Sequence, residues 1–140
     1  MTDEELTIAF ETCSLPRELW THRAHVRVAF VYLRRHTFDV AMEKVRSGIQ
    51  AYNAHSQVPE NQTSGYNETT THAFLHLIHA TMAAYERIYP TPTGDSFCDR
   101  HPQLMTPQVL RLFYSPKQRT HPLAKTQFVE PDLCPLPRIL

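Results

Sequence analysis

Apolar residues recur along the first two thirds of the chain at the three- and four-residue steps of an amphipathic helix. Residues 38–55 carry one such stripe, formed by Phe38, Ala41, Met42, Val45, Ile49 and Tyr52. Residues 68–89 carry another, formed by Phe74, Leu75, Ile78, Met82 and Tyr85. We also predict a helix over residues 21–36 and a shorter one over residues 2–12. No segment alternates between apolar and polar residues for long enough to predict a strand.

Cap and breaker residues mark the ends of these helices. Thr2 and Glu5 form a capping-box pattern, and Thr21, Thr37 and Asn67 each stand where an N-cap is expected. Residues 56–65 have the composition of a loop, and the prolines and glycine within residues 89–94 end the fourth helix. Short helical segments are predicted over residues 107–114, after residue 115 and over residues 123–128.

Together these elements predict an all-α fold, a small helical bundle of three long helices with several short ones. The length of 140 residues predicts one domain over residues 1–140. Eleven prolines against three glycines favour well-ended helices and a stiff C-terminal region. We expect residues 128–140 to lie extended across the surface and to pack back on the domain.

Charge and composition narrow the classes of partner. The formal net charge is zero, so the chain lacks the basic footprint that nucleic acids and anionic membranes require. No apolar run approaches the roughly 20 residues of a membrane span, and the acidic N-terminus argues against a signal peptide. Three widely spaced cysteines form no disulfide or metal pattern, which favours a cytoplasmic location.

The second predicted helix carries two histidines, His22 and His25, one turn apart. Arg23, Arg27 and Arg34 share one side of this helix, and we expect that side to face solvent. The two histidines then point toward the buried face. Each alone is equally well a core residue satisfied by a hydroxyl or a carbonyl. As a pair on one inward face, they can reach one ion or one substrate.

A second stripe of polar residues lies on the fourth predicted helix. Glu68, His72, His76 and His79 are separated by steps of four, four and three residues. Such a stripe can hold a divalent metal at the surface. A solvated helix edge is the favoured interpretation for His76 and His79, with His76 furthest from the core.

Glu68 also stands in the first turn of this helix, where the helix dipole stabilises a carboxylate. One interpretation is that it serves only the helix start, beside the cap residue Asn67. The other is that Tyr66, Glu68 and Thr71 face the two histidines of the second helix. That arrangement provides a base, a carboxylate and hydroxyl donors in one pocket.

Four motifs, in this order, resemble a small, mostly bacterial family of uncharacterised all-helical proteins. They are Thr21-His22-Arg23-Ala24-His25-Val26-Arg27-Val28-Ala29, Tyr66-Asn67-Glu68-Thr69-Thr70-Thr71, Phe113-Tyr114-Ser115, and Phe128-Val129-Glu130-Pro131-Asp132-Leu133 with Pro135-Leu136-Pro137. The middle motif of that family reads Tyr-His-Glu-Thr, whereas Asn67 replaces the histidine here. The resemblance implies an all-helical fold and that the motifs belong together, and it implies no particular activity. If the family histidine is a ligand or a base, its role is lost at Asn67 unless His72 substitutes.

The leading functional hypothesis is a small-molecule enzyme that uses histidine and glutamate acid–base chemistry, with or without one divalent metal. The predicted catalytic residues are His22, His25 and Glu68, and the predicted substrate-binding residues are Tyr66, Thr71 and Tyr32. The predicted metal ligands are His22, His25, Glu68 and His72, a nitrogen and oxygen set that suits zinc, iron, copper or nickel. The alternatives are a non-catalytic ligand- or metal-binding module and a structural or protein-interaction domain.

Overall fold

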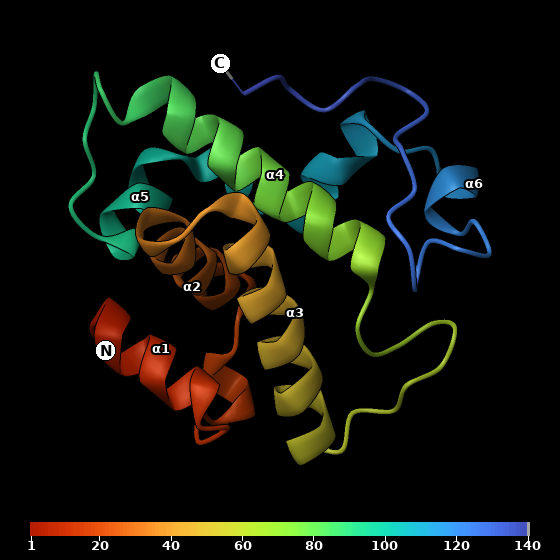
Figure 1. Ribbon diagram of the computed structural model, residues 1–140, viewed down its shortest axis with the longest axis horizontal. Coiled ribbons are helices and arrows are strands. Elements are labelled where there is room, and N and C mark those ends of the chain that lie inside the picture. The colour runs from red at the N-terminus through yellow and green to blue at the C-terminus, as the bar shows by residue number, and fades with distance from the viewer. Residues whose placement is uncertain (140) are drawn as a thin grey trace.

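A computed structural model describes residues 1–139, and it confirms the all-α fold (Figure 1). The helices are α1 (Asp3–Glu11), η1 (Arg17–Leu19), α2 (His22–Arg35), α3 (Phe38–His55), α4 (Glu68–Tyr85), α5 (Gly94–Arg100), η2 (Pro102–Leu104), η3 (Pro107–Leu112) and α6 (Pro116–Arg119). The three long helices predicted from the sequence are α2, α3 and α4. None of the helices within residues 1–139 combines the length and the apolar character needed to cross a bilayer.

The predicted caps form the expected hydrogen bonds. The side chain of Thr2 accepts a hydrogen bond from the amide of Glu5, whose carboxylate accepts one from the amide of Thr2. Thr21, Thr37 and Asn67 accept hydrogen bonds from backbone amides in the first turns of α2, α3 and α4. These bonds satisfy amides that a helix start leaves without intrahelical partners. The starts of the long helices could therefore be predicted from single N-cap residues.

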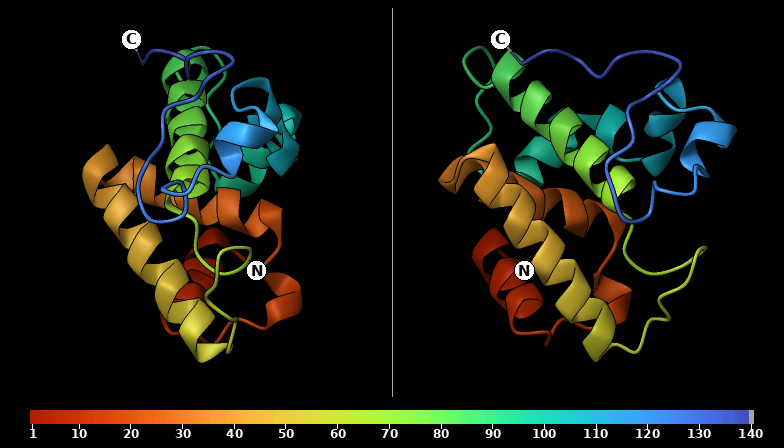
Figure 2. Two further views of the ribbon diagram at one scale, coloured as in Figure 1. Left: turned by 90° about the vertical axis from the view of Figure 1, so that its right-hand side faces the viewer. Right: turned by 45° about the vertical axis from the view of Figure 1, so that its right-hand side comes forward.

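Helix α2 lies at the centre of the fold. It packs against α1, α3, α4 and α5 (Figures 1 and 2). Its buried residues are distributed around the whole helix, as expected for a helix with neighbours on every side. The core cluster extends from Leu6 in α1 to Tyr114 after η3, so the described part of the chain shares one apolar core.

The prediction that the arginine side of α2 faces solvent holds for Arg34, which is exposed, but not for Arg23 and Arg27. Helix α5, which the sequence reading missed, covers part of that side, and Arg23 pairs there with Asp95 and Asp99. Arg27 is mostly buried and pairs with Asp3 of α1 at 3.1 Å. The capping box of Thr93 and Ser96 was the available signal for α5. We had taken the neighbouring Gly94 only as a helix stop.

Two other predicted boundaries need correction. Helix α4 ends at Tyr85 and not near residue 89, because the chain turns and Glu86 accepts hydrogen bonds from the amide and hydroxyl of Thr91. The helix predicted over residues 123–128 is a series of turns. Its carbonyls at Ala124 and Lys125 accept hydrogen bonds from the first amides of α4. Those carbonyls cap a neighbouring helix and do not build one of their own.

Residues 128–139, here called the tail, contain no helix and run alongside α4 (Figures 1 and 2). The hydroxyl of Tyr114 donates a hydrogen bond to the carbonyl of Val129, and Ser115 donates two to Asp132. The ring of Phe128 stacks on His72, with centroids 4.0 Å apart. The described tail is thus extended and packed on the domain as predicted, and residue 140 lies outside the described residues.

Candidate functional site

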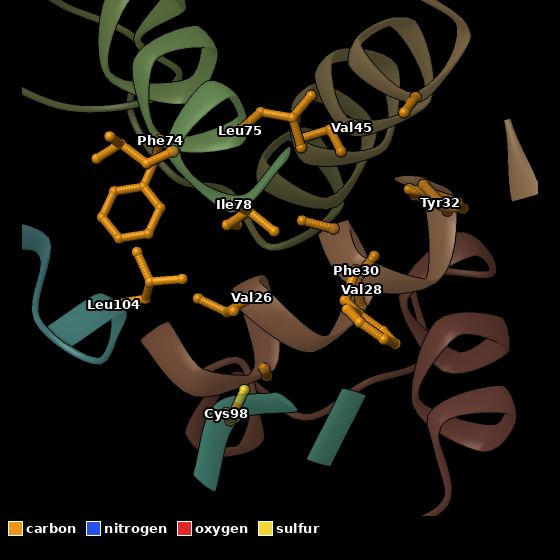
Figure 3. Packing of buried hydrophobic residues seen from close by; sticks show 14 of the residues in the cluster. Val26, Val28, Phe30, Tyr32, Val45, Phe74, Leu75, Ile78, Cys98 and Leu104 are labelled. Carbon is orange, nitrogen blue, oxygen red and sulfur yellow. The ribbon is translucent and has the colours of Figure 1, made fainter. Parts of the chain in front are cut away.

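An apolar cavity, here called the inner cavity, lies in the core between α2, α3 and α4. Its volume is about 140 Å³. Apolar side chains form most of its wall, including Val26 of α2, Ile49 of α3, and Phe74 and Ile78 of α4. Figure 3 shows Phe74 and Ile78 directed toward Val26 across the interface of α4 and α2. The predicted residues His22, His25 and Thr71 also line this cavity.

A second and more polar cavity, here called the outer cavity, adjoins the inner one. Its volume is about 400 Å³. Trp20, His25, Ile49, Thr70 and Thr71 belong to the walls of both cavities, so these residues lie where the two meet. The remainder of the outer wall includes Arg17, Tyr52, Asn53, Tyr66 and Asn67. The arrangement matches the general form of small-molecule sites, which are mostly apolar with a few directed polar groups.

The structure holds His25 in one tautomer. Its Nδ1 lies 2.7 Å from the carbonyl oxygen of Thr21, the N-cap of the same helix. Because a carbonyl only accepts hydrogen bonds, Nδ1 carries the proton and the neutral ring leaves Nε2 as an acceptor. Within residues 1–139, Nε2 makes no hydrogen bond, and it is not among the buried polar atoms that lack a partner, so it is open to solvent. The ring also stacks on Trp20, with centroids 3.7 Å apart, which fixes its plane at the cavity wall.

Burial sets the charge state of His25. The pKa of His25 is lowered from 6.5 to about 4: desolvation by burial is the main cause, the hydrogen bond to Thr21 opposes it, and neighbouring His22 contributes to the lowering. The imidazole is therefore uncharged at neutral pH. It presents a lone pair to the cavity and not a cation.

His22 makes its hydrogen bond through the other ring nitrogen, Nε2. Its Nε2 lies 2.8 Å from the carbonyl oxygen of Leu104 in η2, so this nitrogen carries the proton. The ring meets Phe74 edge to face, with centroids 4.9 Å apart. His22 thus joins α2 to η2 and belongs to the wall of the inner cavity.

Glu68 does not join the histidines of α2. Both oxygens of its carboxylate accept hydrogen bonds from the guanidinium of Arg46, at 2.9 and 2.7 Å, and the hydroxyl of Tyr66 donates another at 2.7 Å. Arg46 above all, and also Tyr66, hold the pKa of the Glu68 carboxyl below its usual range. This group lines a separate surface pocket of about 630 Å³ that contains neither His22 nor His25. The predicted contact between Glu68 and the histidine pair is therefore not present, because α3 supplies Glu68 with a cation.

Of the three predicted substrate-binding residues, two line a cavity together with His25 and one does not. Tyr66 and Thr71 line the outer cavity beside His25. Burial and the contact with Glu68 raise the pKa of Tyr66, so its hydroxyl stays protonated. Tyr32 lines neither cavity, because it points toward α1 and donates a hydrogen bond to Glu11 at 2.9 Å. Its predicted role as a substrate-binding residue does not fit this position.

The predicted metal ligands do not converge either. No group of three or more histidine, cysteine, aspartate or glutamate side chains within residues 1–139 is arranged to hold a metal ion. Arg46 engages Glu68, and His72 packs between Phe38 and Phe128. Of the four predicted ligands, only His22 and His25 share a cavity.

Three residues that matter at these sites were missed from the sequence. Trp20 stacks on His25, and its signal was its place directly before the N-cap of α2. Arg46 had no signal, because its partner Glu68 is 22 residues away on another helix. Asn67 was predicted as the N-cap of α4, whereas its place in a cavity wall was not predicted. It lines the outer cavity, and its side-chain oxygen caps α4.

No protein-family model, curated protein sequence or solved structure matches this chain, so its own geometry is the basis for a functional conclusion.

Proposed function

We propose that this protein binds a small organic molecule in the inner and outer cavities, and that the ligand donates a hydrogen bond to Nε2 of His25. The observation that carries the proposal is the free acceptor nitrogen of a ring that is otherwise fully constrained. Thr21 holds its other nitrogen and Trp20 holds its face. This acceptor is open to solvent in the cavity wall, so a ligand hydroxyl or N–H group can pair with it in place of water.

The charge state of His25 supports binding of a neutral donor over binding of an anion. With the pKa of His25 lowered to about 4, the ring offers no positive charge to a carboxylate or phosphate at neutral pH. The only cationic side chain in the described walls of the two cavities is Arg17, in the outer cavity. An acidic group on the ligand therefore belongs in the outer cavity, near Arg17, and away from the inner cavity.

Acid–base catalysis at His25 is the second candidate function. Two features favour it: the lone pair on Nε2, and the protonated hydroxyl of Tyr66 in the wall of the same outer cavity. In that reaction His25 accepts a proton from the substrate, and Glu68 acts only by positioning Tyr66. We place it second because a base whose conjugate acid has a pKa of about 4 is weak at neutral pH.

A ligand screen with two histidine variants tests the proposal. Wild-type protein, His25→Asn and His76→Asn are screened against a small-molecule library by ligand-observed NMR, with melting curves to verify folding. Asparagine at position 25 can still donate to the Thr21 carbonyl but places no acceptor where Nε2 lies. His76 lies outside both cavity walls and is the matched control.

We expect ligands of the wild type to lose about tenfold or more in affinity with His25→Asn, the cost of an unpaired donor, and to bind His76→Asn unchanged. Equal affinity for the wild type and His25→Asn overturns the proposal. The same mixtures are followed for product formation by mass spectrometry. Turnover that disappears in His25→Asn establishes the catalytic candidate in place of simple binding.

A further inference from the structure

The inner cavity has the size of a single aromatic ring. Its volume of about 140 Å³ compares with the roughly 150 Å³ of an engineered apolar protein cavity that stays dry and binds benzene. A ligand with two fused rings exceeds this space, and a one- or two-carbon group leaves much of it empty. The cavity therefore selects a ligand group of about six or seven non-hydrogen atoms.

The walls of the inner cavity favour an apolar ring over a polar one. Aliphatic and aromatic side chains from α1, α2, α3 and α4 surround the space, among them Phe10, Ala29, Val45 and Leu75. Among residues 1–139, no lysine, arginine, aspartate or glutamate lines it. Burying an uncompensated charge there is strongly unfavourable, whereas burying a ring gains the hydrophobic contribution of its surface.

The polar groups of the inner wall define where a substituent can be accepted. His25 and Thr71 lie where the two cavities meet, and the free nitrogen of His25 accepts a hydrogen bond there. The acceptor nitrogen of His25 pairs best with a hydrogen-bond donor of the ligand, which ethers and hydrocarbons lack.

We propose that the ligand class is a neutral monocyclic aromatic compound bearing a hydroxyl or amino group, with its ring in the inner cavity and its donor on Nε2 of His25. Further substituents of the ligand extend into the outer cavity, whose 400 Å³ provides the additional room. This inference rests on the proposed function and adds the ligand's size, polarity and orientation.

Phenol and toluene, with a C–OH and a C–CH₃ group on the same ring, provide the direct test. Their binding to wild-type protein, His25→Asn and Ala29→Leu is measured by NMR titration up to millimolar concentrations. Ala29 is buried in the inner wall, so leucine at this position fills the cavity. Ala29→Val fills it partly and serves as the milder variant if the leucine strains the fold.

We expect phenol to bind the wild type about tenfold more tightly than toluene, and the two to bind His25→Asn equally. Ala29→Leu should weaken both ligands, and Ala29→Val should weaken both to a smaller extent. Equal binding of phenol and toluene to the wild type overturns the inference, as does phenol binding that neither Ala29 variant changes.

The two proposals can fail separately. If phenol does not bind while library compounds bind in a His25-dependent way, the inference about ligand class is wrong and the proposed function stands. If neither phenol nor any library compound depends on His25, both are wrong.

Discussion

The histidines of α2 and those of α4 use similar contacts but face different neighbours. On α2, one nitrogen of His25 and one of His22 donate to backbone carbonyls, and both residues line the inner cavity. On α4, His72 stacks on Phe128, His79 stacks on Phe38 with centroids 5.5 Å apart, and His76 donates to a carbonyl of the tail. Similar helical spacing thus places the two histidines of α2 in a cavity wall and those of α4 in a packing surface, because different elements lie opposite.

The α4 histidines hold the tail in place. Besides the stack of His72 on Phe128, Nε2 of His76 lies 2.6 Å from the carbonyl oxygen of Pro137 and so donates to it. The hydroxyl of Thr69 in the same helix donates to the carbonyl of Gln127 and accepts from the amide of Val129. These contacts correct the expectation of a solvated helix edge at His76. They involve two of the four sequence motifs, because Thr69 belongs to the motif of residues 66–71, and Phe128, Val129 and Pro137 belong to the motif in the tail.

The largest expected difference between the histidines of α2 and those of α4 is the pH dependence that His25 gives to the free energy of unfolding. Burial lowers the pKa of His25 from 6.5 in the unfolded chain to about 4 in the folded state, so only the unfolded chain takes up this proton between those values. The contribution of the neutral His25 ring to the free energy of unfolding is fully present above pH 6.5 and is lost as the pH falls toward 4. Between pH 7 and pH 4, we expect the wild type to lose about 3 kcal/mol more than His25→Asn.

Urea unfolding of both proteins across this pH range measures the difference. The other buried histidines are present in both proteins and cancel in the comparison. Stability curves that run parallel from pH 7 to pH 4 would show that His25 titrates alike in the folded and unfolded states.

The next largest effect concerns the histidines of α4 and the tail that they contact. Phe128→Ala removes the stack on His72 and a partly buried ring, and should destabilise the protein by about 2 kcal/mol. Leu133 lies in the same tail and is 59 % exposed, so Leu133→Ala is the matched control with a change below about 0.5 kcal/mol.

Hydrogen exchange locates the effect of Phe128→Ala. The amide of Val129, bonded to Thr69, should exchange faster in that variant, while ligand binding at the α2 histidines stays unchanged. Equal destabilisation by Phe128→Ala and Leu133→Ala would refute the role of the α4 stripe in holding the tail.

The smallest effect tests why Glu68 is separate from the histidine pair. A double-mutant cycle with Arg46→Met and Glu68→Gln should give a coupling free energy of about 1–2 kcal/mol, because the pair is two-point and Glu68 is mostly buried. The pair Arg35–Glu4 is exposed on both sides and should give less than about 1 kcal/mol. If the cycle yields no coupling free energy between Arg46 and Glu68, pairing with Arg46 does not explain why Glu68 lies apart from the histidine pair.

Local signals determined what could be predicted from the sequence. Thr2, Thr21, Thr37 and Asn67 each mark a helix start through a bond to the residue three positions away, and the starts of α1 to α4 were predicted correctly. The apolar stripes placed the long helices because burial follows the 3.6-residue period. The short helix α5 was missed, since it depends on packing against α2.

The site was only partly predictable, because its contacts join different elements of the fold and local sequence signals do not report such contacts. His22 and His25 line a cavity, although the argument that placed them there assumed a solvated arginine face that α5 and α1 cover. The partners of Glu68 and Tyr32 are on other helices, and no spacing within one helix reports such contacts. The role of His76 depended on where an extended tail runs, which no periodicity encodes.

The central claim is that His25 is neutral, protonated on Nδ1 and open on Nε2, and the ¹⁵N NMR spectrum of its imidazole tests this most directly. We predict that the Nδ1–H tautomer is the one observed at neutral pH, with a pKa of about 4, and that the Nε2 signal shifts when phenol is added. A ring that titrates near 6.5, or that carries its proton on Nε2, would contradict the account.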